Sequence, residues 1–347
     1  MSISGNRCND SGHVVRSSVK TIGFMLLLLM VFWASAPAFA ADMILYSGRK
    51  EKAIKPVVDA FTAQTGITVA LKTGKTSGLA NTLILEKNRP RADVFIATVG
   101  GVMEILAGKG VLSSYRSPAA ERLPAEFKSE SGYWTGISGR ARIIIYNTEL
   151  VAHNDVPKSV FELVDPQWKG KVAVAGTRER TTLSWASWLV HEKGKDSIQQ
   201  YFQQLGSNGL TILSDNSEVW RGVGRGEFAI GVTNSPNSHL AVRAGLPVGE
   251  VYPDQDTIGT LVNLNAIAVV QGGPHPEPAK RFVDFVLSSS GQRLLIENAY
   301  EIPLVANVDS GSVKPLSAIK TPSLTVRSLA DAADSTMDLL RTIDPRW

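Results

Sequence analysis

The sequence predicts an α/β protein with two lobes and a cleft between them. Three observations lead to this fold class. Strand and helix patterns alternate between residues 43 and 106, a second alternating block runs from 143 to 287, and extended segments join the blocks. Alternating strands and helices favour layered architecture with a mostly parallel sheet. Ligands of such folds bind where the carboxyl ends of strands meet helix N-termini.

The first block contains three predicted strand–helix pairs. Its strands are short apolar or alternating runs at 43–46, 67–71 and 92–97. Its helices are predicted from apolar residues that share one helical face. These are Ile54, Val57, Val58 and Phe61 in the first, Leu79 and Leu83 in the second, and Val102, Ile105 and Leu106 in the third. Gly66 ends the first helix, and residues 73–78 form a loop before the second.

The second block continues the same alternation. Its predicted strands are 143–146, 171–175, 210–212, 228–232 and 261–270. Apolar faces predict a short helix at 160–164 and longer ones around Leu183 to Val190, Trp220 to Val223 and Ala279 to Leu287. One more amphipathic segment lies near Leu329, Met337 and Leu340.

The first forty residues have the pattern of a secretory signal peptide. Arg7, Arg16 and Lys20 precede the apolar run 22–33, and small residues at Ala38 and Ala40 occupy the −3 and −1 positions. The run is shorter than the roughly 20 residues of a membrane span; an uncleaved anchor is the alternative. We predict cleavage after Ala40 and export to the periplasm.

Composition excludes a disordered chain, since 44% of the 347 residues are hydrophobic and 20% are charged. Cleavage removes three basic residues, one acidic residue and the only cysteine, Cys8, so the formal net charge of +4 becomes +2. The remaining chain has no thiol and no run of Lys and Arg typical of nucleic-acid binding. We expect neither a disulfide nor a nucleic-acid partner.

Catalytic and metal-binding motifs are missing from the sequence. No G-x-S-x-G motif occurs, and Gly74-Lys75-Thr76 lacks the earlier glycine of a phosphate-binding Walker loop because Val69 stands at that position. The four histidines after residue 40 lack metal-ligand spacing. The sequence therefore predicts no enzyme, no cofactor and no metal site.

Loops rich in Gly, Ser, Thr, Asn and Arg lie at predicted strand-to-helix turns. They are 47–50, 73–78, 139–140, 177–182, 215–217 and 233–238. Free N–H groups at helix N-termini bind anions, and Arg binds phosphate or carboxylate bidentately. The alternative is that the hydroxyls only cap their helices.

Several motifs, in this order, resemble the periplasmic ferric-ion-binding group of ABC-transporter solute-binding proteins. They are Leu45-Tyr46-Ser47-Gly48, Ala92-Asp93-Val94-Phe95, Ser138-Gly139-Arg140-Ala141-Arg142, Tyr146-Asn147-Thr148, Trp168-Lys169-Gly170-Lys171, Gly226-Glu227-Phe228 and Gly291-Gln292. The likeness extends to about Val305. It implies a type II periplasmic fold with hinge strands, and lobes formed by 41–140 plus 262–305 and by 141–261 plus 306–347. It also implies capture of a small solute for an inner-membrane ABC permease and its ATPase. We expect a monomer.

The iron ligands of that group are replaced here. The resemblance implies a His or similar ligand in the first loop, a Glu or Gln after the Ala-Asp-Val-Phe strand, and two adjacent tyrosines. This sequence has Arg49-Lys50, Thr98, and Pro236-Asn237 at those places. What the resemblance retains is the group's anion pocket, at 177–182, Asn216 and Asn234.

We therefore predict binding of a small anionic solute, an organophosphonate such as 2-aminoethylphosphonate or a phosphorylated metabolite. The predicted ligand-binding residues are Arg49, Lys50, Thr76, Ser77, Thr98, Arg140, Thr177, Arg178, Arg180, Thr181, Thr182, Asn216, Asn234, Asn237 and Asp254. Asp254 or Asp215 would hold an amine. One alternative is ferric binding through atypical ligands, such as Tyr252 with Asp254, and an exogenous chelator. The alternative of another class is an exported phosphoryl hydrolase.

Overall fold

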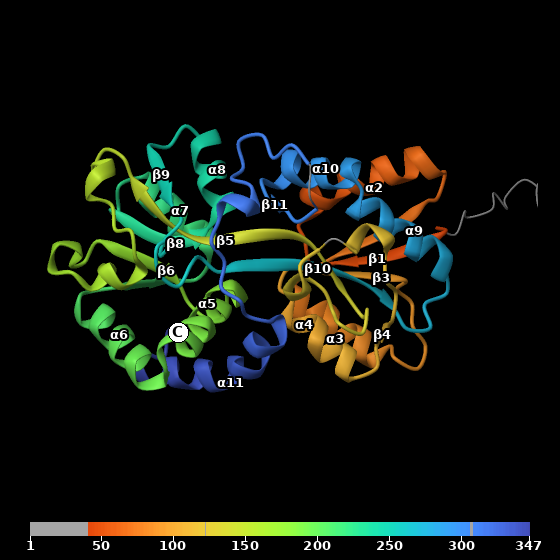
Figure 1. Ribbon diagram of the computed structural model, residues 1–347, viewed down its shortest axis with the longest axis horizontal. Helices are drawn as coiled ribbons and strands as arrows, with labels where there is room; N and C mark the ends of the chain where they lie inside the picture. Colours follow the sequence, from red (N-terminus) through yellow and green to blue (C-terminus); the bar gives the residue numbers. More distant parts are fainter. Residues whose placement is uncertain (1–40, 122, 306–307) are drawn as a thin grey trace, which may run out of the picture. The chain divides into compact units, whose positions relative to one another are not determined.

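The computed structural model describes residues 41–347, except for 122 and 306–307. The predicted signal peptide lies outside the described residues. Residues 41–347 form one compact unit of mixed strands and helices (Figure 1). Within this described part, no helix combines the length and the apolar character needed to cross a membrane.

The first sheet is built on a parallel core of three strands. β1 (Met43–Ser47) pairs in parallel with β2 (Val69–Thr73) and with β3 (Val94–Ala97). β10 (Val262–Val270) continues this sheet antiparallel to β3 and to β5 (Thr135–Asn147). The remaining elements around it are β4 (Leu112–Ser113), β11 (Ile302–Pro303), α2 (Glu51–Thr65), α3 (Thr76–Leu85), α4 (Gly101–Gly108), α9 (Pro276–Leu287) and α10 (Ser289–Ala299).

Helix α2 illustrates how the sequence determines this half. It buries Ile54, Val57, Val58 and Phe61, the four residues predicted from the apolar pattern. Gly66 ends the helix in the left-handed conformation, with φ of 74°, which glycine adopts without steric cost. Phe61 packs edge to face on Phe282 of α9, with ring centroids 5.1 Å apart.

The second sheet has the order β5, β8, β6, β7. β6 (Val172–Ala175) pairs in parallel with β7 (Thr211–Leu213) and β8 (Ile230–Asn234), while β5 is antiparallel to β8 and to β9 (Val248–Val251). The helices of this half are α5 (Arg180–Lys193), α6 (Lys195–Ser207), α7 (Asn216–Gly224), α8 (Ser235–Arg243) and α11 (Val326–Ile343). α11 packs against α5 and α6 of this half and also against α4 of the first (Figure 1).

Strand β5 belongs to both sheets. Ala141 pairs with Val262 in the first sheet, and the next residue, Arg142, pairs with Asn234 in the second. The change of partner falls between two adjacent residues, so one strand connects the two halves. Arg140 and Arg142 therefore lie on either side of the crossing point.

Several predictions about elements were wrong or incomplete. The sheet is not mostly parallel, because six of the ten strand pairings are antiparallel. Gly139-Arg140 lies inside β5 and not at a strand-to-helix turn. Helix α3 begins at Thr76, inside the predicted loop. In α4, Met103 is buried whereas Ile105 is 52% exposed. The prediction missed β4, β9, β11, α6 and α10, and it gave no bounds for α8, the helix after the predicted turn at 233–238.

Candidate functional site

Five of the predicted loops do connect a strand to a helix. They follow β1, β2, β6, β7 and β8 and lead into α2, α3, α5, α7 and α8. Asp215 caps α7 by accepting hydrogen bonds from the backbone N–H groups of Ser217 and Glu218. The other four helices begin without a side-chain cap among the described residues. At these four, the interpretation that hydroxyls only cap the helix is wrong. Helix N-termini of this kind suit an anion, although Pro236 leaves the first turn of α8 with one N–H fewer.

Arg142 is the centre of a buried polar cluster on the second sheet. Its side chain is 1% exposed. Nη1 donates to Asn216 Oδ1 at 2.8 Å and to Asn234 Oδ1 at 3.4 Å, and Nη2 donates to Thr182 Oγ1 at 2.9 Å. Of five N–H groups, the one on Nε and one on Nη2 have no partner among the described residues. Two such donors suit bidentate recognition of a phosphoryl or carboxylate group.

The electrostatic environment of Arg142 also favours an anion. Burial lowers the pKa of Arg142 to about 9, because the charged guanidinium has lost its water. Glu179 opposes this shift and the nearby Arg140 adds to it. An anion at the two unpartnered N–H groups would stabilise the charged form.

Asn216 links the surrounding loops to this cluster. Asn216 Nδ2 donates to Glu179 Oε2 at 2.6 Å and to Thr181 Oγ1 at 3.2 Å. Asn234 Nδ2 donates to the same Thr181 oxygen at 3.3 Å. The predicted residues of the loops after β6, β7 and β8 are therefore brought together.

Two further predicted residues lie at the edge of this cluster. Asn237 Nδ2 donates to Thr233 Oγ1 at 2.7 Å, and Thr233 in turn contacts Asn216. Thr177 is buried, and its Oγ1 has no partner among the described residues.

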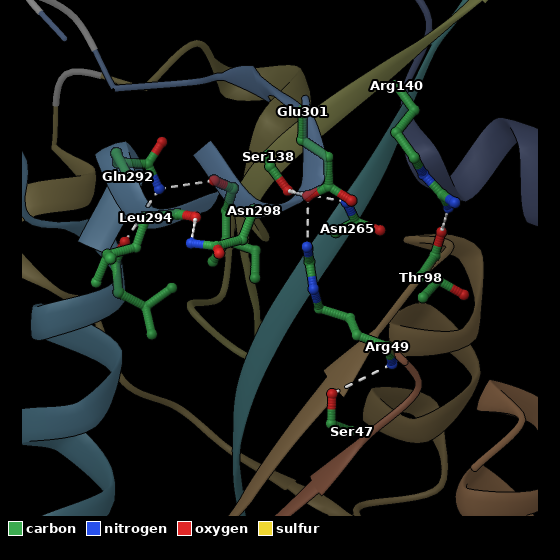
Figure 2. A network of polar contacts seen from close by, with 12 residues as sticks. Ser47, Arg49, Thr98, Ser138, Arg140, Asn265, Gln292, Leu294, Asn298 and Glu301 are labelled. Atoms are coloured by element: carbon green, nitrogen blue, oxygen red, sulfur yellow. Dashed lines mark hydrogen bonds and ion pairs between the residues drawn. The ribbon is translucent and has the colours of Figure 1, made fainter. Parts of the chain in front are cut away.

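A second buried network surrounds Arg49 on the first sheet. Arg49 Nη1 donates to Glu301 Oε2 at 2.5 Å, and both side chains are less than 10% exposed. Ser138 on β5 donates to the same carboxylate oxygen and accepts from Asn265 on β10 at 2.8 Å. Figure 2 shows this network, with the Glu301 carboxylate between Ser138 and Arg49. The Nε of Arg49 has no partner among the described residues.

Thr76, Thr98 and Arg140 are also brought together. The hydroxyls of Thr76 and Thr98 are 2.9 Å apart, and Arg140 Nη2 donates to the Thr98 carbonyl (Figure 2). Gly48 permits this approach, because a Cβ there would lie 2.1 Å from Thr76 Oγ1. Burial lowers the pKa of Arg140, with Glu301 opposing the shift and Arg49 adding to it. The positive charge of Arg49 therefore disfavours the charged form of Arg140.

The remaining predicted residues differ in their surroundings. Lys50, Ser77, Arg178 and Arg180 are exposed, and their side chains make no hydrogen bond or ion pair with other described residues. Asp254 lies elsewhere: its carboxylate accepts from Ser159 Oγ at 2.5 Å and from the Val160 N–H at 3.3 Å. Neither Asp254 nor the helix-capping Asp215 is grouped with the arginines.

Sequence reasoning missed Arg142, Glu179, Glu301, Ser138 and Asn265. A signal for Arg142 was present, because residues two apart in a strand point to the same face. Arg142 stands two residues after Arg140 in the quoted Ser-Gly-Arg-Ala-Arg motif. Glu301 had no local signal, since its partner Arg49 is 252 residues away.

Residues 89–323 match the bacterial extracellular solute-binding protein family. The chain belongs to this family. A major ferric iron-binding protein of Neisseria meningitidis serogroup B is 28% identical to this solute-binding protein over 321 residues, covering 89% of this chain and 95% of the relative. A protein of Salmonella typhi, provisionally named as a 2-aminoethylphosphonate-binding periplasmic protein, is 24% identical over 296 residues. The aligned region covers 82% of this chain and 85% of that relative.

Solved structures agree on the two-lobed fold of this solute-binding protein. Iron-bound HitA from Pseudomonas aeruginosa superimposes with a TM-score of 0.79 at 26% identity, covering 87% of this chain and 99% of that one. The predicted fold class and the family resemblance are thereby confirmed. The family comprises binding proteins and not enzymes, so the alternative of an exported phosphoryl hydrolase receives no support.

Proposed function

We propose that this protein is the periplasmic solute-binding component of an ABC importer and that it captures a small organic phosphonate or phosphate ester, such as 2-aminoethylphosphonate. Solute-binding proteins of this family deliver their solute to an inner-membrane permease and its ATPase. The lobe boundaries, export by a signal peptide cleaved after Ala40 and a monomeric state are part of the same proposal.

The observation that carries the proposal is the unsatisfied buried guanidinium of Arg142. Its hydrogen-bond partners within the protein are neutral amide and hydroxyl oxygens of Asn216, Asn234 and Thr182. A buried charge that makes no direct ion pair is costly, and a bound anion would lower that cost. The uncapped N-terminus of α5 lies directly beside it, with Thr182 in its first turn.

Ferric iron is the second candidate, because the relatives named above include ferric binders. The tyrosine pair expected from the resemblance is replaced by Pro236 and Asn237 in the first turn of α8. In the described residues, no group of three or more His, Cys, Asp or Glu is placed to hold a metal. The phenol of Tyr252 has no partner there, but Asp254 is already bound by Ser159 and Val160.

A thermal-shift panel tests the proposal on the protein prepared without its first forty residues. It compares inorganic phosphate, methylphosphonate, 2-aminoethylphosphonate, fructose 6-phosphate, ferric citrate and citrate alone. Ligand at 100 times its dissociation constant adds about 2.7 kcal/mol. Unfolding entropy of about 0.64 kcal/mol/K for residues 41–347 converts this into a rise of roughly 4 °C. The proposal is rejected if no phosphoryl compound raises the melting temperature and ferric citrate does.

A further inference from the structure

A largely apolar cavity of about 210 Å³ has Arg180 among its lining residues, whereas neither Arg140 nor Arg142 lines it. Its walls come from the start of α4, the first turns of α5, the start of β10, and α11, the helix that packs on both halves. Apolar lining residues include Leu183, Leu261, Leu264, Val326 and Leu329. A cavity of about 150 Å³ lined by Leu, Ile and Phe already accepts benzene, so this space suits an alkyl or aryl group.

Strand register places one cavity residue, Asn263, on the arginine face of the crossing strands. Asn263, which lines the cavity, is paired directly with Arg140, and side chains of such antiparallel pairs share one face. Arg142, two residues along β5, therefore shares that face, and its backbone N–H bonds to the carbonyl of the cavity residue Leu261 at 2.8 Å. Helix α5 contributes Thr182 to the Arg142 cluster and Leu183 to the cavity wall. The cavity and the anion-binding donors are therefore adjacent.

Polar side chains lie between the apolar part of the cavity and the anion-binding donors. Asn263 is 3% exposed, and its Nδ2 donor has no partner among the described residues. An oxygen of a phosphoryl group seated at the arginines would satisfy this donor. Glu126, Asp334 and Arg180 also line the cavity. Because two of these three side chains are acidic, the excess negative charge opposes entry of a dianionic head and leaves the cavity to the rest of the solute.

We infer that the cavity holds the organic arm of the bound anion, and that this arm is apolar and of propyl to phenyl size. The inference rests on the proposed function, because the phosphoryl head must be held by Arg140 and Arg142 for its arm to reach the cavity. It narrows the proposed class to phosphonates and phosphate esters with a hydrocarbon substituent, and it ranks 2-aminoethylphosphonate, the example given with the proposed function, below them.

Calorimetric titration of the unmodified protein with methyl-, propyl- and phenylphosphonate tests the inference. Each buried methylene contributes about fourfold in affinity, so propylphosphonate is expected to bind roughly 15-fold more tightly than methylphosphonate. The isosteric 2-aminoethylphosphonate, whose ammonium replaces the terminal methyl group, is expected to bind more weakly than propylphosphonate.

A matched pair of variants locates the effect. Ala333→Phe fills the cavity from α11, whereas Ala332→Phe adds the same ring next to it on a residue that does not line the cavity. Ala333→Phe is expected to reduce phenylphosphonate affinity at least tenfold and leave methylphosphonate within threefold, and Ala332→Phe to change neither. Melting curves of both variants verify that they fold.

The possible results separate this inference from the proposed function. If all phosphonates bind with the same affinity, or if 2-aminoethylphosphonate binds tenfold more tightly than propylphosphonate, the apolar arm is refuted and the anion site stands. If no phosphonate or phosphate ester binds, both fail. If benzene stabilises the protein and phosphonates do not compete with it, the cavity is a separate site and the inference is overturned.

Discussion

Replacing Arg142 with glutamine should abolish anion binding with little loss of folding stability. Two unpartnered N–H groups of Arg142 are available for a ligand, and hydrogen bonds involving a charged group contribute about 1.5–3 kcal/mol each. Losing both removes about 3–6 kcal/mol, which weakens binding by about 100-fold to 10,000-fold.

The effect of Arg142→Gln on stability combines two opposing terms. The substitution removes a buried charge, which is favourable by several kcal/mol. It also disturbs hydrogen bonds to Asn216, Asn234 and Thr182, at about 1 kcal/mol or more each, although the glutamine amide can replace one of them. The net change should stay within about 2 kcal/mol, or roughly 3 °C in melting temperature.

The assay is calorimetric titration of wild type and variant with whichever phosphoryl compound gives the largest thermal shift. Arg281→Gln is the matched control, because Arg281 is an exposed arginine on α9, outside the predicted ligand-binding residues. Exposed charges are screened by salt, so this control should bind within threefold of wild type at 0.15 M salt. A folded Arg142→Gln protein that binds within threefold of wild type would refute the role assigned to the cluster.

Three other expectations follow from the same contacts. Glu301→Gln leaves the buried Arg49 charge unpaired and should cost about 3–5 kcal/mol of unfolding free energy, which lowers the melting temperature by roughly 5–8 °C. Replacing both residues with methionine should restore most of the lost stability. A Glu301→Gln variant with the melting temperature of wild type would contradict this expectation. Gly48→Ala places a Cβ 2.1 Å from Thr76 Oγ1 and should destabilise by about 1–3 kcal/mol, with Thr76→Ala in the same chain relieving most of the loss in a denaturant titration. Burial lowers the pKa of Arg142 in the folded protein to about 9, well below the ordinary value for arginine. Above about pH 9 the unfolded chain therefore binds more protons, and the unfolding free energy of the ligand-free protein should rise with pH. Phosphonate affinity should fall over the same range, and a pH series in which Arg142→Gln retains both trends would count against this assignment.

Local patterns predicted most of the elements but not the strand that joins the two halves. β5 begins with Thr135-Gly136-Ile137-Ser138-Gly139-Arg140, which lacks apolar alternation, yet 12 of its 13 residues are buried. Polar residues can be buried there because they bond to one another and to distant partners, as Ser138 does to Glu301 and Asn265. A strand that is stabilised by long-range polar contacts has no periodic signal in its own sequence.

Site residues were predicted where they follow the end of a strand, and they were missed where they lie inside a strand. Thr181, Thr182, Asn216 and Asn234 follow strands, and their types suit anion binding at helix N-termini. Arg142 lies inside β5, and only the fold reveals that its guanidinium reaches those loops. The proposed amine-binding role of Asp254 came from residue type alone. In the structure, Asp254 has a φ of 62° and its carboxylate is bonded to Ser159 and Val160.

The charges around the crossing point of β5 also bear on the choice between an anion and ferric iron. Among the described residues, the carboxylates that act on Arg49, Arg140 and Arg142 are those of Glu179 and Glu301, which leaves this group with a formal excess of one positive charge. A phosphoryl dianion offsets this excess, whereas Fe³⁺ would increase it to four. Phenolate ligands would normally supply the missing negative charge, but burial raises the pKa of Tyr252, and Glu250 adds to the shift, so that the phenol keeps its proton. Iron could therefore enter this site only with an anionic chelator whose carboxylates meet the same arginines, and citrate without iron should then bind as well.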